Sequence, residues 1–134
     1  MSKMRYIEEV DQGNFSERQS NCPVAKPQNM IAGKWKLTIL WLLSIQTRRF
    51  NELQRLLPGI SKGILTHQLR ELESDDLIHR EVYREVPPKV EYSLTEVGVS
   101  FIPVLEKIAE WGRQYEEKKA ELEKNVLFQD DSIL

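Results

Sequence analysis

Three polar side chains, Thr66, His67 and Arg70, lie between leucines in the segment KGILTHQLRELESD at residues 62–75. At helical spacing, this hydroxyl, imidazole and guanidinium point away from the face formed by the leucines at 65, 69 and 72. The leucines would anchor such a helix to a core. The polar groups would remain available to hydrogen-bond with base edges, and the major groove of duplex DNA accepts one helix.

The residues that precede this helix match the needs of its first turn. Ser61 fits the N-cap, where a hydroxyl accepts a hydrogen bond from a free backbone amide. The remaining amides, together with Lys62, can hold a phosphate at the positive end of the helix dipole, and Gly63 lets the backbone approach closely. The predicted DNA contacts of this helix are therefore Ser61, Lys62, Gly63, Thr66, His67 and Arg70.

Catalytic and metal chemistry find no comparable pattern. The chain has one cysteine, Cys22, so an intramolecular disulfide and a cysteine-based zinc site are excluded. Its two histidines, His67 and His79, stand apart without a metal-ligand pattern around them. No nucleophile is paired with a base and no phosphate-binding glycine loop is present, so we expect no enzyme, no metal and no cofactor.

The elements that would position the polar helix follow from periodicity and turn residues. Pro58-Gly59 predicts a tight turn directly before it. We expect helices at residues 24–32, 34–45, 51–57 and 62–75, a β-hairpin at 78–85 and 90–94, and a last helix from Glu96 towards Lys124 with a kink or break near Pro103. This order predicts a mainly α, α+β fold, the winged helix-turn-helix, with the hairpin as its wing.

Basic side chains flank the predicted helix. Arg84 and Lys89 stand at the hairpin tip, where we expect them to contact the DNA backbone or the minor groove. Lys34, Arg48 and Arg49 are secondary candidates for phosphate contacts. We expect Arg80 to pair instead with Glu81 or Glu91 within the hairpin.

Charge is segregated along the chain although its formal net charge is only -2. Residues 22–80 carry nine Lys or Arg against five Asp or Glu, whereas residues 93–134 carry five against nine. A basic central module followed by an acidic helix fits a domain that presents one face to a polyanion such as DNA. Chance asymmetry would give the same numbers, so this observation only supports the helix pattern.

The length of 134 residues predicts one domain with tails. We expect a flexible arm at residues 1–21, the DNA-binding and dimerisation domain at 22–118, and a charged helix end with a frayed tail at 119–134. No apolar run approaches the roughly 18 residues of a membrane span, and the first twenty residues lack a signal-peptide pattern. We therefore expect a cytoplasmic protein without membrane contact.

Several sequence blocks in a constant order resemble the HxlR-type bacterial transcription regulators, relatives of the broader MarR group. The resemblance covers about residues 21–115. Its landmarks are CPV at 22–24, GKWK at 33–36, RRFNEL at 48–53, PGIS at 58–61, LTHQLRELE at 65–73, VPPKVEYSLT at 86–95 and WG at 111–112. KGIL at 62–65 departs from the family, where longer polar residues often stand, so Gly63 is expected to contact fewer bases.

The resemblance implies a two-fold homodimer that pairs through its first and last helices and binds pseudo-palindromic promoter DNA. One short domain has too little core to cover the apolar stripe of the last helix. We therefore expect Val104, Ile108 and Trp111 in the subunit contact.

Two alternatives remain open at the level of sequence. In some members of the family a cysteine in this CP context senses oxidants or electrophiles, so Cys22 is either a redox sensor or an inert packing residue. A small-molecule signal is the other input expected of such a regulator. The second alternative is a winged-helix module that uses its basic face to bind an acidic protein rather than DNA.

Overall fold

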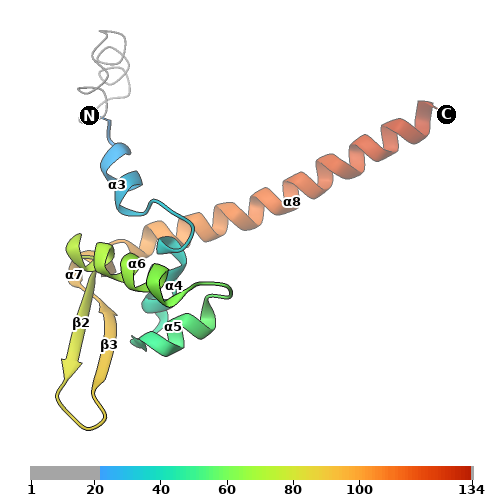
Figure 1. The fold of residues 1–134 in the computed structure, drawn as a ribbon. Coiled ribbons are helices and arrows are strands. Elements are labelled where there is room, and N and C mark those ends of the chain that lie inside the picture. Colours follow the sequence, from blue (N-terminus) through green and yellow to red (C-terminus); the bar gives the residue numbers. More distant parts are fainter. Residues whose placement is uncertain (1–21, 134) are drawn as a thin grey trace.

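The computed structural model describes residues 22–133 (Figure 1). The predicted N-terminal arm, residues 1–21, lies outside this part of the chain. In chain order the elements are α3 (Ala25–Met30), α4 (Lys36–Ile45), β1 (Arg48–Arg49), α5 (Phe50–Leu56), α6 (Lys62–Ser74), β2 (Ile78–Tyr83), β3 (Lys89–Leu94), α7 (Glu96–Ser100) and α8 (Ile102–Ile133). The predicted mainly α winged helix-turn-helix fold is confirmed.

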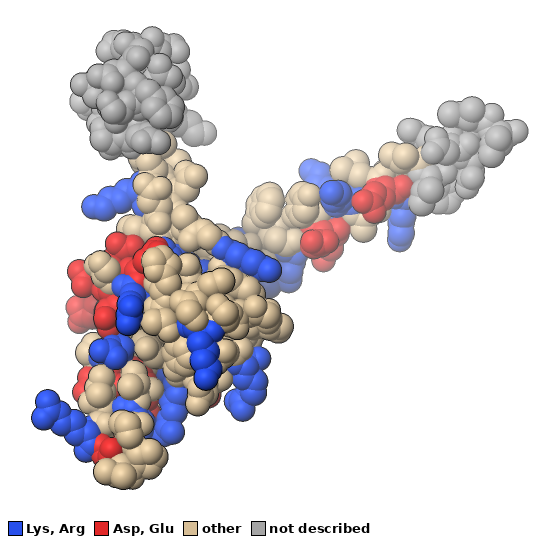
Figure 2. Space-filling model, in the orientation of Figure 1, with Lys and Arg blue, Asp and Glu red and all other residues tan. Residues whose placement is uncertain are grey.

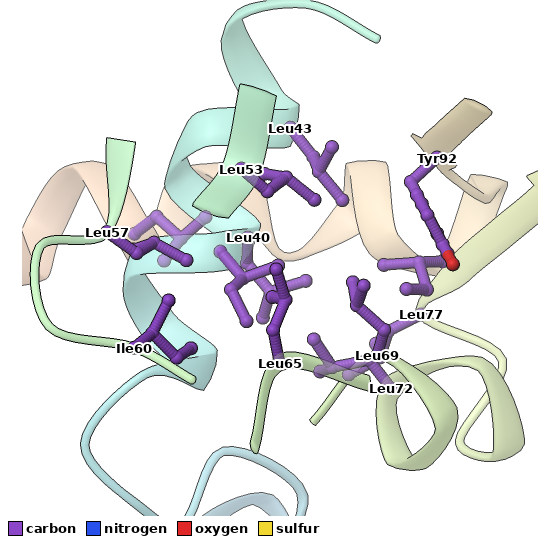
Figure 3. Close-up of a cluster of buried hydrophobic side chains, with 13 residues drawn as sticks. Leu40, Leu43, Leu53, Leu57, Ile60, Leu65, Leu69, Leu72, Leu77 and Tyr92 are labelled. Atoms are coloured by element: carbon purple, nitrogen blue, oxygen red, sulfur yellow. The ribbon is translucent and has the colours of Figure 1, made fainter. Parts of the chain in front are cut away.

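The hydrophobic core joins the helix-turn-helix to the sheet and to the start of α8. Figure 3 shows Leu65, Leu69 and Leu72 of α6 pointing toward Leu40 of α4 and Leu53 of α5, as helical spacing predicts. Further buried members include Ile39, Leu43, Leu57, Ile60, Leu77, Ile78, Tyr92 and Leu105. Because one face of α6 is fixed in this core, its opposite face is held toward solvent.

Local signals set both ends of the turn before α6. Gly59 has φ +86°, a left-handed conformation that side chains other than hydrogen rarely adopt. The Ser61 hydroxyl accepts a hydrogen bond from the Ile64 amide at 3.1 Å and so caps the helix. Both features confirm the predicted turn and N-cap.

The sheet has three strands rather than the predicted two. β1 pairs with β3 in antiparallel orientation, giving the order β1-β3-β2. Arg48 lies opposite Tyr92 and Arg49 opposite Glu91. A strand of two residues has no alternating pattern for a sequence argument to detect, so β1 was missed.

The polypeptide bends sharply between the sheet and α8. The Thr95 hydroxyl accepts a hydrogen bond from the Gly98 amide at 3.0 Å and caps α7. The predicted break occurs at Phe101, and Pro103 falls in the first turn of α8, where a missing N–H costs little. α8 continues to Ile133, beyond the predicted end near Lys124.

Most of α8 projects away from the rest of the domain (Figure 1). Of the residues expected to face inward from this region, Leu105 is buried and Phe101 packs on the core. Val97, like Tyr115 further along, is exposed instead, and so is Val24, which was expected near the core before α3. In the described part of the chain, no helix is long and apolar enough to cross a membrane.

Candidate nucleic-acid interface

The outer face of α6 carries the six residues predicted to contact DNA. Ser61, Lys62, Gly63, His67 and Arg70 are exposed and Thr66 is partly exposed. A Cβ atom at Gly63 would meet no other atom within 4 Å, so the space beside this backbone is open. The Thr66 hydroxyl donates to the Lys62 carbonyl at 2.7 Å, which leaves its lone pairs and methyl group for an external partner.

Glu71 links this outer face to the core. One of its carboxylate oxygens accepts a hydrogen bond from the Lys36 ammonium, and the other contacts His67 Nε2. The hydrogen bond from Lys36 holds the pKa of Glu71 below its ordinary value, with the charges of Lys36 and His67 acting in the same direction. His67 is therefore oriented by a carboxylate that is itself fixed by the core helix α4.

Lys36 is a functional neighbour that sequence reasoning missed. It is only 2% exposed although it carries a charge. Its partner lies 35 residues away in sequence, so no local pattern links the two side chains. Burying an ammonium requires such a partner, because the unpaired charge would lose its hydration without compensation.

The wing presents one of its two predicted cations differently from the expectation. Arg84 is exposed in the loop between β2 and β3. Lys89 instead forms an ion pair with Glu91 at 2.9 Å, and its ammonium lies 4.8 Å from the centre of the Tyr83 ring. The hydrogen bond from Lys89 lowers the pKa of Glu91. Arg84 is thus the more accessible of the two for phosphate contact.

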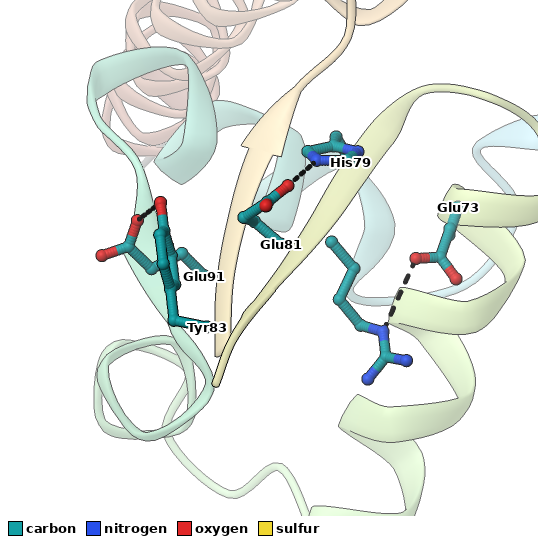
Figure 4. Close-up of polar contacts among 6 residues, drawn as sticks. Glu73, His79, Glu81, Tyr83 and Glu91 are labelled. Carbon is teal, nitrogen blue, oxygen red and sulfur yellow. Dashed lines mark hydrogen bonds and ion pairs between the residues drawn. The ribbon is translucent and has the colours of Figure 1, made fainter. Parts of the chain in front are cut away.

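The wing face shown in Figure 4 also carries paired polar groups. The Tyr83 hydroxyl donates to Glu91 at 3.4 Å, and His79 Nε2 contacts Glu81 at 2.6 Å. The nearby negative charge of Glu91 raises the pKa of Tyr83, so its hydroxyl remains protonated at neutral pH. Carboxylates on this face would repel a phosphate, which leaves the loop beyond Tyr83 as the basic part of the wing.

Arg80 does not pair with Glu81 or Glu91, so that expectation is wrong. Its Nε lies 3.8 Å from a carboxylate oxygen of Glu73 on α6 (Figure 4). Arg80 is opposite Tyr92 in the strand register, whereas Glu81 is opposite Glu91. Successive strand residues point to opposite faces of a sheet, so Arg80 is directed to the α6 side and both glutamates to the other.

The secondary basic candidates divide in the same way. Arg48 Nε donates to the Leu42 carbonyl near the end of α4 at 3.3 Å, so this side chain is partly committed to the fold. Arg49 is exposed at the end of β1, and Lys34 is exposed with its ammonium 4.8 Å from the centre of the Trp35 ring. Figure 2 shows Lys and Arg side chains spread over the body and the hairpin rather than joined in one patch.

The predicted dimer residues and Cys22 lie outside this face. Val104, Ile108 and Trp111 on α8 are 45%, 40% and 64% exposed in the single chain. Cys22 is partly exposed, and its carbonyl accepts a hydrogen bond from the Ala25 amide at 3.1 Å just before α3. In residues 22–133, no group of three or more His, Cys, Asp or Glu side chains is placed to hold a metal ion.

Comparison with known proteins places this arrangement among described regulators. Residues 30–120 match the family described as HxlR-like helix-turn-helix. Two similar relatives, both from Bacillus subtilis (strain 168), are uncharacterised HTH-type transcriptional regulators. YdeP is 48% identical over 108 residues, covering 81% of this chain and 84% of YdeP. YybR is 42% identical over 117 residues, covering 87% of this chain and 94% of YybR.

Among solved structures, the redox regulator HypR in its reduced form is similar, with a TM-score of 0.69 and 46% sequence identity. The match covers 71% of this chain and 94% of HypR. The arrangement of the capped helix, its turn and its wing is therefore shared with proteins described as regulators.

Proposed function

Because the chain belongs to the HxlR-like helix-turn-helix family and is thus an HTH-type transcriptional regulator, we propose that it binds pseudo-palindromic promoter DNA as a homodimer. The observation that carries this proposal is the division of α6. Its leucine face is buried in the core, and its polar face is open beside the wing. A helix held in this way can enter the major groove without unfolding any of its anchors.

The homodimer has support from the apolar side chains along α8. Val104, Ile108 and Trp111 leave a large hydrophobic surface uncovered in the single chain, and Tyr115, Leu122 and Val126 extend it. Pairing with a second copy would remove this surface from water, a favourable change of about 25 cal/mol per Å² of apolar area. A two-fold pair would also present two copies of α6 to two half-sites, about 34 Å apart along the DNA.

Binding assays with matched variants separate base contacts from phosphate contacts. Thr66→Ala and His67→Ala each remove a group proposed to contact base edges. We expect each to weaken the selected operator by about 1 kcal/mol, roughly fivefold, with little change for random duplex. Arg84→Ala should weaken both duplexes alike and reduce the slope of log affinity against log salt by about one unit. The measurement is titration of labelled duplexes over a salt series, after selection of the operator from a random pool.

Lys89→Ala is the control for Arg84→Ala, since the Lys89 ammonium is paired with Glu91. It should change the salt slope less than Arg84→Ala does. An Arg84→Ala protein with wild-type affinity and slope would refute the role of the wing loop. A wild-type protein that binds no duplex, but binds an acidic protein, would replace the proposed function with the protein-binding module.

We further propose that Cys22 responds to oxidants or electrophiles. The support is its CP context, its partial exposure before α3, and the similarity of the chain to a structure described as a redox regulator. The thiolate is the species that reacts with an electrophile. As the only cysteine of the chain, it would form a disulfide with a second subunit or with a small thiol. Modification beside the proposed dimer contact would change the spacing of the two α6 helices.

The test compares wild type with Cys22→Ser before and after treatment with diamide or a quinone. We expect the wild-type protein to lose operator affinity by about tenfold or more, as one half-site is released, while Cys22→Ser keeps its affinity. The readout is the operator titration, together with the mass of the treated protein. An equal response of both proteins, or none in either, would make Cys22 a packing residue.

A further inference from the structure

A polar notch lies where α6 meets the sheet. It has a volume of about 150 Å³ and is lined by Thr66, Leu69, Arg70, Glu73, Arg80 and Tyr92. Four of these residues belong to α6, and the other two face each other across β2 and β3. The notch is therefore formed jointly by the helix proposed to enter the groove and by the base of the wing.

The charged groups of the notch favour an anion. Two guanidinium groups, those of Arg70 and Arg80, are combined with the single carboxylate of Glu73. Burial raises the pKa of Tyr92 and the charge of Glu73 adds to this, while the charges of Arg80 and Arg70 oppose it. Both arginines thus act on the space around the Tyr92 hydroxyl, and the lining carries a net positive charge.

The Arg80 side chain is positioned but not saturated. Its Nε is 3.8 Å from the Glu73 carboxylate, at the outer limit of an ion pair. Both side chains are nearly half exposed, at 48% and 44%, so the pair itself contributes little to stability. A guanidinium has five N–H donors in a planar fork, and those beyond Nε remain able to bind two oxygens of one phosphate.

We propose that this notch binds a backbone phosphate of the DNA, with Arg80 as its principal donor. The inference rests on the proposed function, because it places α6 in the major groove. Thr66 and Arg70 line the notch and also lie on the α6 face proposed to enter that groove. A DNA strand bordering the groove would pass between α6 and the wing, with a phosphate above Arg80. This contact would fix the depth and orientation of α6 without selecting a base.

The first experiment measures Arg80→Gln on the operator and on random duplex over a salt series. Loss of one charged phosphate contact in each subunit should weaken both duplexes by about tenfold or more and lower the salt slope by about one unit per contact. Arg113→Gln is the matched control, since Arg113 is exposed on α8 outside the notch. Urea unfolding should give both variants nearly the wild-type stability.

The second experiment identifies the phosphate. Single methylphosphonate substitutions, which remove one backbone charge at a time, are placed along each operator half-site. We expect one position at which the wild-type protein loses affinity and Arg80→Gln loses none, while every other position affects the two proteins equally. Inorganic phosphate at millimolar concentration serves as a separate arm. If it bound the notch tightly and Arg80→Gln abolished only that binding, the site would belong to a free anion.

The outcomes distinguish this inference from the proposed function. A wild-type protein without salt-dependent duplex binding would remove the function itself. A wild-type protein that binds DNA normally, with Arg80→Gln showing the same affinity, slope and methylphosphonate profile, would overturn the notch and leave the function intact.

Discussion

Replacing Gly98 with alanine is expected to destabilise the domain by about 3 kcal/mol. A Cβ atom on Gly98 would lie 2.1 Å from the Leu77 carbonyl oxygen and 3.2 Å from Leu94 Cδ2. The Leu77 carbonyl cannot move freely, because it also accepts a hydrogen bond from the Thr95 amide at 3.1 Å. Alanine is the better helix former by about 1 kcal/mol, so the steric contact must exceed that gain. α7 would have to separate from the start of the wing.

The free energy of unfolding from urea titration measures this effect. Gly63→Ala in α6 is the control, because a Cβ there meets nothing within 4 Å. It should leave stability unchanged or raise it by up to about 1 kcal/mol. Equal small changes in both variants would show that α7 does not pack against Leu77 at this distance.

Ile108→Asp is expected to convert the proposed dimer to monomers and to lower operator affinity by about 100-fold or more. Ile108 lies within the exposed apolar stripe of α8, so a carboxylate there would be desolvated in the subunit contact. A monomer binds one half-site and loses the gain in effective concentration that joins the two half-sites. Sedimentation at micromolar protein concentration and operator titration give the two readouts.

Lys107→Asp is the matched control, since it places the same carboxylate on the neighbouring residue. The Lys107 side chain is highly exposed and pairs only with Glu110 on its own helix. This variant should remain dimeric. An Ile108→Asp protein that remains dimeric would exclude this part of α8 as the contact, and a monomeric wild-type protein would refute the homodimer.

The helix-turn-helix was predictable from sequence because its signals are local. Leu65, Leu69 and Leu72 give the buried face of α6 by helical periodicity. Ser61 caps the helix, and Gly59 forms the turn, through the chemistry of single residues. The break before α8 follows in the same way from Pro103. The residues on the open face of α6 followed once its buried face was known.

The partners of the charged groups were decided only by the tertiary structure. Lys36 is neutralised by Glu71 from a helix far along the chain, so its burial had no local signal. Strand register and the alternation of side chains place Arg80 on the α6 side of the sheet, away from Glu81. The same packing pairs β1 with β3 and joins Arg70 to Arg80 in one notch. The sequence determined which segments form helices and strands, since that depends on neighbours within a few residues. Which charges meet depends on how those segments pack, and only the folded structure decides that.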